Sequence, residues 1–176
     1  MLTSLVRGIC AAGMGILLLM TSMVTAASAQ PVPAERSQAA RPAAGAFTAA
    51  VDFSSLVARD VRGNKCEFTV NGTLTFTGTL EGTAQGTTRA VIFAPCSSAT
   101  TSPPGTFFDV FAFGGTFTGT VNGVPVGGDL TYAGITRVGG AIDAKIILTG
   151  DGARAVLRAD AVVAVGGTYR GVAKPT

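Results

Sequence analysis

Apolar and polar residues alternate along most of the chain, and the alternation is clearest between Cys66 and Leu80. Cysteine, phenylalanine, valine and leucine occupy even-numbered positions of this segment, whereas threonine and other polar residues occupy the odd-numbered ones. Successive side chains of a strand point to opposite faces, so a period of two predicts a β-strand with one buried and one solvated face. Asn71-Gly72 predicts a break of this run into a tight hairpin, because Asn-Gly favours the type I′ turn.

The same alternation returns several times, separated by Asn-Gly, Gly-Gly and Asp-Gly pairs that are typical of turns. The segment from Ser97 to Gly105 is the one long interruption. This pattern predicts an all-β domain of seven or eight strands with short antiparallel connections. The positions that define the further strands are Phe47, Ala49, Val51 and Phe53; Phe107, Phe111, Phe113, Phe117 and Val121; Leu130 and Tyr132; Ile142, Ala144, Ile146 and Leu148; and alternate residues from Ala153 to Val165.

Glycines inside the predicted strands distinguish between two all-β architectures. A strand-interior glycine permits strong bending and coiling, and closing a sheet removes its exposed edges. We therefore expect an antiparallel, eight-stranded barrel, with a two-sheet sandwich as the alternative. The glycines concerned are Gly78, Gly114, Gly115, Gly119, Gly134, Gly166 and Gly171.

The first 29 residues have the organisation of a secretory signal peptide. Arg7 is their only charge, an almost wholly apolar run follows from Ile9 to Val24, and Ala27-Ser28-Ala29 forms an A-x-A cleavage site. A membrane anchor is the rival interpretation, but the apolar run is shorter than the ~20 residues that span a bilayer. We expect cleavage after Ala29, a secreted product, and no membrane association once the signal is removed.

The rest of the chain divides into a linker and one domain. Residues 30–45 contain three prolines and many alanines, which cannot bury enough surface to offset chain entropy, so a flexible linker is expected there. Residues 46–176 then form a single β-barrel domain of ordinary size.

Two of the three cysteines remain after cleavage, because Cys10 lies in the signal peptide. Two cysteines in an exported chain most often form a bridge, so a Cys66–Cys96 disulfide is expected. Closing this loop should stabilise the domain by roughly 3–4 kcal/mol in the chain-entropy model. A redox role would favour a C-x-x-C spacing, which this pair lacks.

Composition excludes several classes of function. The chain has no histidine, which removes Ser-His-Asp and Cys-His nucleophile systems, and two thiols cannot complete a zinc shell. The charges are scattered, and the densest basic group, Arg59, Arg62 and Lys65, fits a solvated loop, so no nucleic-acid partner is expected. No phosphate-cradling glycine motif opens a helix, and we expect neither a metal nor a cofactor.

Three stretches carry a resemblance to a known family. They are FTGTLEG, FGGTFTGTVNGVPVGGDLTYAG and GDGARAVLRADAVVAVGGTYRG, with F-x-G-T-[LV]-x-G strands and a Gly-Asp-Gly turn, and they lie between Phe68 and Gly171. They resemble the allene oxide cyclase-like barrel proteins, most closely the bacterial branch of unknown function (the DUF3224 type). The resemblance implies an eight-stranded, calycin-like barrel with an apolar interior. It carries over no cyclase residue, because none can be matched to a position here.

Four polar residues on otherwise apolar runs are candidates for ligand binding. Asp109 shares the parity of neighbouring phenylalanines, and burial would raise its pKa toward a range useful for acid–base work. Arg89 could pair with Asp109 or Glu81, and Tyr132 could offer its hydroxyl to a ligand. Structural roles are the favoured interpretation: Asp109 at the wet mouth of the barrel, Arg89 in an ion pair with Asp109 or Glu81, and Tyr132 as a core or rim residue.

These features leave three functions open. The first is a secreted barrel that binds a small apolar ligand, since eight-stranded barrels hold one small ligand or fill with side chains. The second is a non-enzymatic extracellular structural or interaction module that acts through its threonine-rich outer face. The third is a cyclase or isomerase of the allene oxide cyclase type. A cavity distinguishes the first from the second, and a buried carboxylate distinguishes the third from the first.

Overall fold

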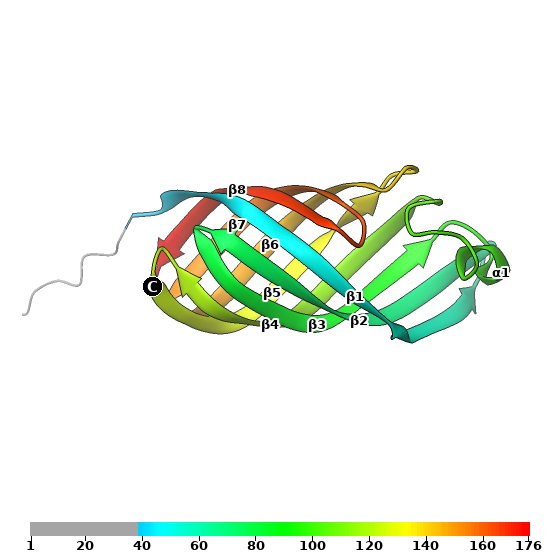
Figure 1. Cartoon of the computed structure of the whole chain (residues 1–176), viewed down its shortest axis with the longest axis horizontal. Coiled ribbons are helices and arrows are strands. Elements are labelled where there is room, and N and C mark those ends of the chain that lie inside the picture. Colours follow the sequence, from blue (N-terminus) through cyan, green and yellow to red (C-terminus); the bar gives the residue numbers. More distant parts are fainter. Residues whose placement is uncertain (1–38) are drawn as a thin grey trace, which may run out of the picture. The chain divides into compact units, whose positions relative to one another are not determined.

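The computed structural model describes residues 39–176, and these form one antiparallel sheet that closes into a barrel (Figure 1). Each strand pairs with the next along the chain, and β8 pairs with β1. The all-β prediction and the closed barrel are confirmed, and the sandwich alternative is wrong. The elements are β1 (Arg41–Val61), β2 (Lys65–Gly78), β3 (Leu80–Ile92), α1 (Cys96–Ala99), β4 (Asp109–Val121), β5 (Val124–Thr136), β6 (Ala141–Asp151), β7 (Ala153–Val162) and β8 (Gly166–Pro175).

The up-and-down order gives the barrel two unlike ends. The long β3–β4 connection carries α1, and it lies at the same end as the β1–β2, β5–β6 and β7–β8 turns. We call this the α1 end. The tight β2–β3, β4–β5 and β6–β7 turns lie at the other end together with the C-terminus (Figure 1), and we call this the C-terminal end.

Strand β2 runs without interruption through Asn71-Gly72, so the hairpin predicted there is wrong. Asn71 pairs with Asp52 on one side and with Thr87 on the other, and both neighbours hold it in extended conformation. The turn comes instead at Gly78, whose φ of 102° lies in the left-handed region that favours glycine. Pairing on both edges therefore overrides the local preference of Asn-Gly.

Two further boundaries differ from the sequence prediction. β1 begins at Arg41 and buries Ala43, so the barrel includes residues 41–45 that the sequence assigned to the linker. The predicted last strand ends at Val162, and a separate strand, β8, follows the turn. The predicted signal peptide and the linker up to residue 38 lie outside the described residues.

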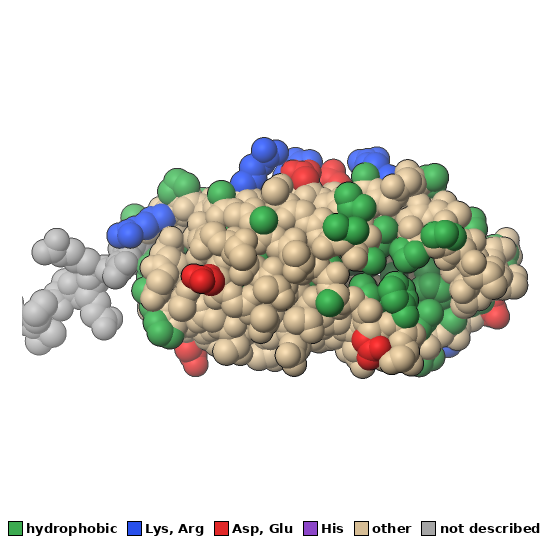
Figure 2. All heavy atoms as spheres, viewed as in Figure 1, with side chains coloured by type: hydrophobic (Ala, Val, Ile, Leu, Met, Phe, Trp, Pro, Cys, Tyr) green, Lys and Arg blue, Asp and Glu red, His purple; other side chains and the backbone are tan. Residues whose placement is uncertain are grey.

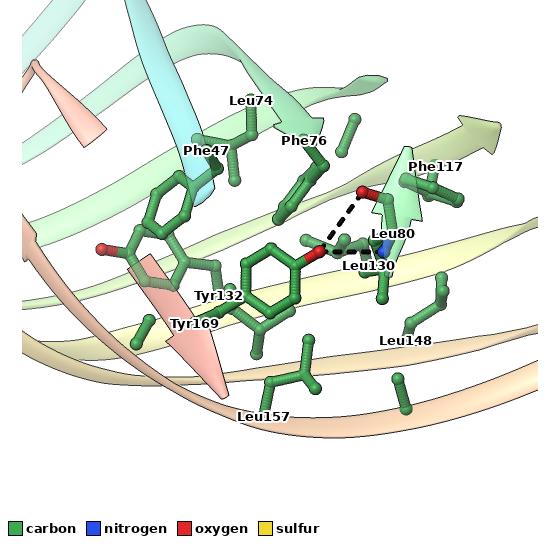
Figure 3. Packing of buried hydrophobic residues seen from close by; sticks show 14 of the residues in the cluster. Phe47, Leu74, Phe76, Leu80, Phe117, Leu130, Tyr132, Leu148, Leu157 and Tyr169 are labelled. Carbon is green, nitrogen blue, oxygen red and sulfur yellow. Dashed lines mark hydrogen bonds between the residues drawn. The ribbon is translucent and has the colours of Figure 1, made fainter. Parts of the chain in front are cut away.

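The half of the barrel toward the C-terminal end is filled with side chains (Figure 3). Phe76 and Phe117 meet edge to face with ring centroids 6.0 Å apart, and leucines from four other strands close around them. Edge-to-face packing and full burial of such large side chains make this half the main source of hydrophobic stabilisation. The leucines are Leu80, Leu130, Leu148 and Leu157, each no more than 1% exposed.

Tyr169 of β8 fixes the C-terminal end by reaching across the interior to the β2–β3 turn. Its hydroxyl accepts a hydrogen bond from the Leu80 amide at 2.8 Å (Figure 3). The same hydroxyl lies 3.0 Å from the Thr77 carbonyl, to which it can donate. The first residues of β1 must leave room for this hydroxyl, because a Cβ on Gly45 would collide with it and with the Thr77 carbonyl. Glycine is therefore required at position 45 by packing.

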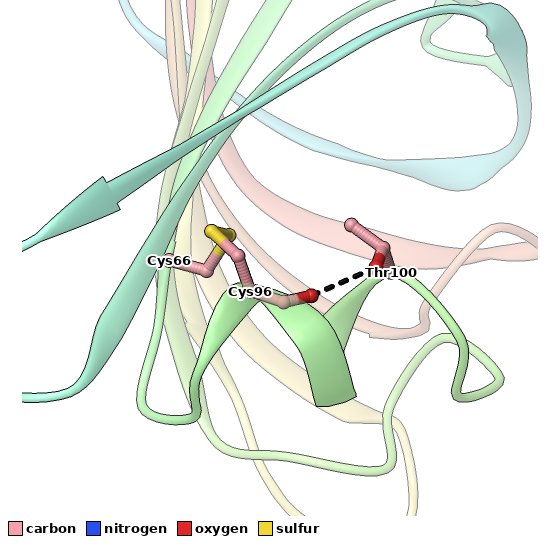
Figure 4. Close-up of a disulfide and its surroundings, with 3 residues drawn as sticks. All are labelled: Cys66, Cys96 and Thr100. Carbon is pink, nitrogen blue, oxygen red and sulfur yellow. Dashed lines mark hydrogen bonds between the residues drawn. A yellow bond between two sulfur atoms is a disulfide. The ribbon is translucent and has the colours of Figure 1, made fainter.

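The disulfide Cys66–Cys96 is present, which confirms the sequence prediction (Figure 4). It joins the start of β2 to α1 with Cα atoms 4.8 Å apart. Cys66 is fully buried and packs with Ile92, Ala94 and Ala99 in a second, smaller apolar cluster. The bridge and this cluster together hold the short helix against the rim of the barrel.

Candidate binding cavity

The half of the barrel toward the α1 end is hollow. It contains a cavity of about 410 Å³, which falls in the range of small-ligand sites and is well above the ~150 Å³ that holds one benzene. Figure 2 shows hydrophobic side chains gathered in a hollow at this end of the molecule. Most of the lining is apolar, and its inner wall is formed by Phe47, Leu74, Ala90, Ile92, Phe111, Phe113 and Ile142.

One wall of the cavity is the β3–β4 connection that carries α1. Ala99, Phe107 and the Pro103-Pro104 pair of this segment line the cavity. Cys96 begins α1, so the disulfide tethers this wall to β2 (Figure 4). Two prolines and a covalent link restrict the conformations of this segment, so the wall is held in place by the chain itself.

A bulge in β1 contributes another part of the cavity lining. The pairing of β1 with β2 shifts between Asp52 and Val57, which gives β1 three more residues than β2 in this stretch. The Asp52 carboxylate accepts a hydrogen bond from the Ser54 amide at 3.0 Å, and the Ser55 hydroxyl accepts one from the Asn71 amide at 2.8 Å. The bulge thereby presents Phe53, which is 56% exposed, and its neighbour Leu56 at the mouth.

Asp109 is the charged group of this cavity. It opens β4, lies directly opposite Thr136 of β5 and Ile92 of β3, and is buried with its side chain on the cavity wall. Burial raises the pKa of the carboxyl from 3.8 to about 6, although a hydrogen bond with the Thr136 side chain acts in the opposite direction. The prediction that Asp109 shares the apolar face of β4 is confirmed, and its surroundings are those of a buried carboxyl.

Tyr132 lies deeper, where the cavity meets the filled half. Its ring packs edge to face against Phe47 and Phe111, with centroids 5.4 and 5.0 Å away. Its hydroxyl points away from that of Tyr169 (Figure 3), and it is buried without a hydrogen-bond partner among the described residues. Burial raises the pKa of this phenol, so the hydroxyl stays protonated.

The other two candidates, Arg89 and Glu81, do not reach the cavity. Ala90 and Ile92 are the inward residues of the later part of β3, so Arg89 points outward and is exposed, as is Glu81 at the start of the strand. Arg89 forms no ion pair with Asp109 or Glu81 in the part of the chain that the structure describes, and the predicted pairing is wrong.

The exposed charges of β6–β8 pair with one another on the outside of the barrel. Arg158 reaches Asp143 at 3.1 Å and Arg170 lies 3.8 Å from Asp160. These ion pairs are exposed to solvent, so each of them contributes little to the stability of the fold.

Sequence reasoning missed Thr136, which is the partner of Asp109, the buried carboxyl among residues 39–176, and is itself 1% exposed. The register of the β4–β5 hairpin would have predicted this pairing. The hairpin turns at Asn122-Gly123, and Asp109 lies thirteen residues before Asn122, just as Thr136 lies thirteen residues after Gly123. Sequence reasoning also missed the bulge, for which Asp52 with Ser54 and Ser55 two and three residues later is a weak local signal.

Comparison with known proteins assigns neither a family nor a function to this chain, because the sequence matches no protein-family model and no curated protein. Within residues 39–176, no cluster of three or more acidic or cysteine side chains is arranged to hold a metal ion. The same region contains no helix that is long and apolar enough to cross a membrane. The cavity itself is therefore the feature from which function is inferred.

Proposed function

We propose that this protein is an exported barrel that binds a small apolar molecule in the cavity at its α1 end. The observation that carries the proposal is a preformed hollow of about 410 Å³, lined mostly by apolar side chains, in a barrel whose other half is filled. Ligand sites of soluble proteins are concave, largely apolar and carry a few placed polar groups. The disulfide supports an oxidising, extracytoplasmic location, as does the signal-like sequence of the first 29 residues.

The mouth supports binding as well. Phe53 and Leu56 on the β1 bulge line the cavity together with the prolines of the β3–β4 connection. Exposing Phe53 to water in the free protein is unfavourable, and a bound apolar molecule would cover part of its ring. A dedicated bulge with four side-chain and backbone hydrogen bonds holds these residues at the opening.

Native mass spectrometry of the mature protein, purified from its own culture medium with the disulfide intact, tests this proposal. We expect an additional mass that is lost on denaturation, and binding of an apolar fluorescent dye that Ala90→Leu abolishes. Ala90 lines the cavity, whereas Ala112 of β4, which follows the cross-strand partner of Ala90, is exposed on the outer face. Ala112→Leu is therefore the matched control and should bind dye as the wild type does. Absence of both an additional mass and dye binding would refute the proposal.

A second candidate is an isomerase or cyclase of the kind that the allene oxide cyclase resemblance implies. One observation favours it: a buried carboxyl, Asp109, stands in an apolar cavity with a raised pKa, as acid–base catalysis requires. Relationship to that family stays a proposal, and Arg89 and Glu81 lie outside the cavity, so Asp109 would have to act with hydroxyl groups alone. Turnover of an unsaturated or epoxide ligand by the wild type but not by Asp109→Asn would support this candidate.

A further inference from the structure

The cavity carries a single formal charge. Among the residues that line it, Asp109 is the only acid, no lysine or arginine is present, and Tyr132 is the only other titratable group. The four ion pairs of the described residues all lie on the outer surface, so none of their cations faces Asp109. At neutral pH the interior of the hollow half is therefore negative and uncompensated.

Asp109 retains hydrogen-bonding capacity toward the cavity. An ionised carboxylate offers about four acceptor sites and no donor. The Thr136 side chain uses one of them, and the flanking Ile92 and Phe111 supply none. A desolvated carboxylate with free acceptor sites is costly, so the site gains most from a ligand that brings a donor.

The same arrangement disfavours acidic ligands. A carboxylate or phosphate head group beside Asp109 would place two like charges together in an apolar space, with no lysine or arginine on the wall to stabilise either. Binding of such a ligand would require a proton to be taken up first.

We propose, building on the binding function above, that the cavity selects apolar molecules whose polar end is a hydrogen-bond donor, a hydroxyl or an ammonium group held by Asp109, and that it discriminates against carboxylates. The hydrocarbon part then lies along Phe111 and Phe113 toward Phe47. The head group stays near the α1 end, because Asp109 is the first residue of β4.

Displacement of an apolar fluorescent dye by four eight-carbon compounds tests this assignment: n-octane, 1-octanol, octylamine and octanoate, at pH 7.5. We expect octanol and octylamine to compete at least about tenfold better than octanoate, as expected for a charge-assisted hydrogen bond. In Asp109→Asn, the advantage of octylamine over octanoate should fall by about tenfold or more.

Asp143→Asn is the matched control, because it makes the same substitution in a carboxylate that lies on the outer surface beside Arg158, and it should change these ratios by less than about threefold. If octanoate competes as well as the donors do, or if Asp109→Asn leaves the ratios unchanged, the head-group assignment is wrong while the binding barrel stands. If none of the four compounds displaces dye and no dye binds, the proposed function itself fails, and this inference with it.

Discussion

The hydroxyl of Tyr169 accepts a hydrogen bond from the Leu80 amide, 89 residues away in the sequence and 2.8 Å away in space. β8 carries the tyrosine and Leu80 begins β3, so the contact crosses β1 and β2 from inside. It supplies a partner for a buried amide at the point where the chain turns from β2 into β3. The ring also packs against Phe76, with centroids 6.0 Å apart. A single side chain thus joins the last strand to the β2–β3 turn.

Two tyrosine-to-phenylalanine variants should have opposite effects on stability. Tyr169→Phe leaves the Leu80 amide without its partner and should lower the free energy of unfolding by about 1–3 kcal/mol. Tyr132→Phe removes a buried hydroxyl that has no partner, so it should be neutral or stabilising by up to about 1 kcal/mol. Urea denaturation of both variants measures the difference. Equal destabilisation by the two would show that Tyr132 finds a partner in solution.

The two halves of β4 should respond differently to the same truncation. Phe117 lies in the filled half and is fully buried, so Phe117→Ala should cost about 3–5 kcal/mol. Phe111 already faces the cavity on one side, and Phe111→Ala should cost clearly less because fewer contacts are lost. Thermal and urea unfolding of both variants provide the comparison. A larger loss for Phe111→Ala would mean that the hollow half is closed in solution.

Removal of the disulfide should weaken both the fold and the cavity. Cys66 and Cys96 are 30 residues apart, and the chain-entropy model gives roughly 3–4 kcal/mol for a loop of this length. We expect the double variant Cys66→Ala/Cys96→Ala to lose about this much in guanidinium denaturation and to bind dye more weakly, because α1 is no longer tethered. Unchanged dye affinity in the folded variant would show that the apolar contacts of Ala99 and Ile92 suffice to hold this wall.

Asp109 should make stability depend on pH in a defined window. Its pKa is raised in the folded state, from 3.8 to about 6, so the fold favours the protonated carboxyl. The stabilisation is complete below about pH 4 and is lost as the pH rises to about 6; at about 1.4 kcal/mol per pKa unit, the upper limit is roughly 3 kcal/mol. Unfolding of wild type and Asp109→Asn between pH 3.5 and 7.5 should therefore diverge as the pH falls, with the wild type gaining relative to the variant. If the stabilities of wild type and Asp109→Asn changed in parallel with pH, the Asp109 carboxyl would be exposed to water in solution.

More of the architecture than of the candidate site could be predicted from the sequence. Period-two alternation placed Phe76, Phe117 and Leu157 on the interior correctly, because each strand of a barrel has one buried face. It could not say that Arg89 lies outside, since the inward residues of β3 are mostly small, its outward ones include Val91, and Phe93 follows directly after the strand. On that strand, hydrophobicity and orientation are no longer correlated.

The disulfide and the inward position of Asp109 were also predictable from the sequence. The disulfide follows from counting cysteines, and the position of Asp109 follows from its place on the same alternating face as the neighbouring phenylalanines. The cavity was not predictable, because whether a barrel is filled depends on volumes summed across strands. Small residues such as Ala49, Ala90 and Gly166 come together at the α1 end only once the register is known. The Asn71-Gly72 prediction failed for the same reason: the neighbouring strands, which local sequence does not reveal, decided it.

The filled half has a consequence for how fast a bound molecule can be replaced. Because Phe76, Phe117 and the leucines around them fill the C-terminal half, the cavity is closed at that end, and a bound molecule enters and leaves through the α1 half. An incoming molecule cannot push its predecessor out from behind. Exchange should then proceed by dissociation first, at a rate that does not change with the concentration of the competitor, so the barrel would keep its contents for a time set by the mouth alone.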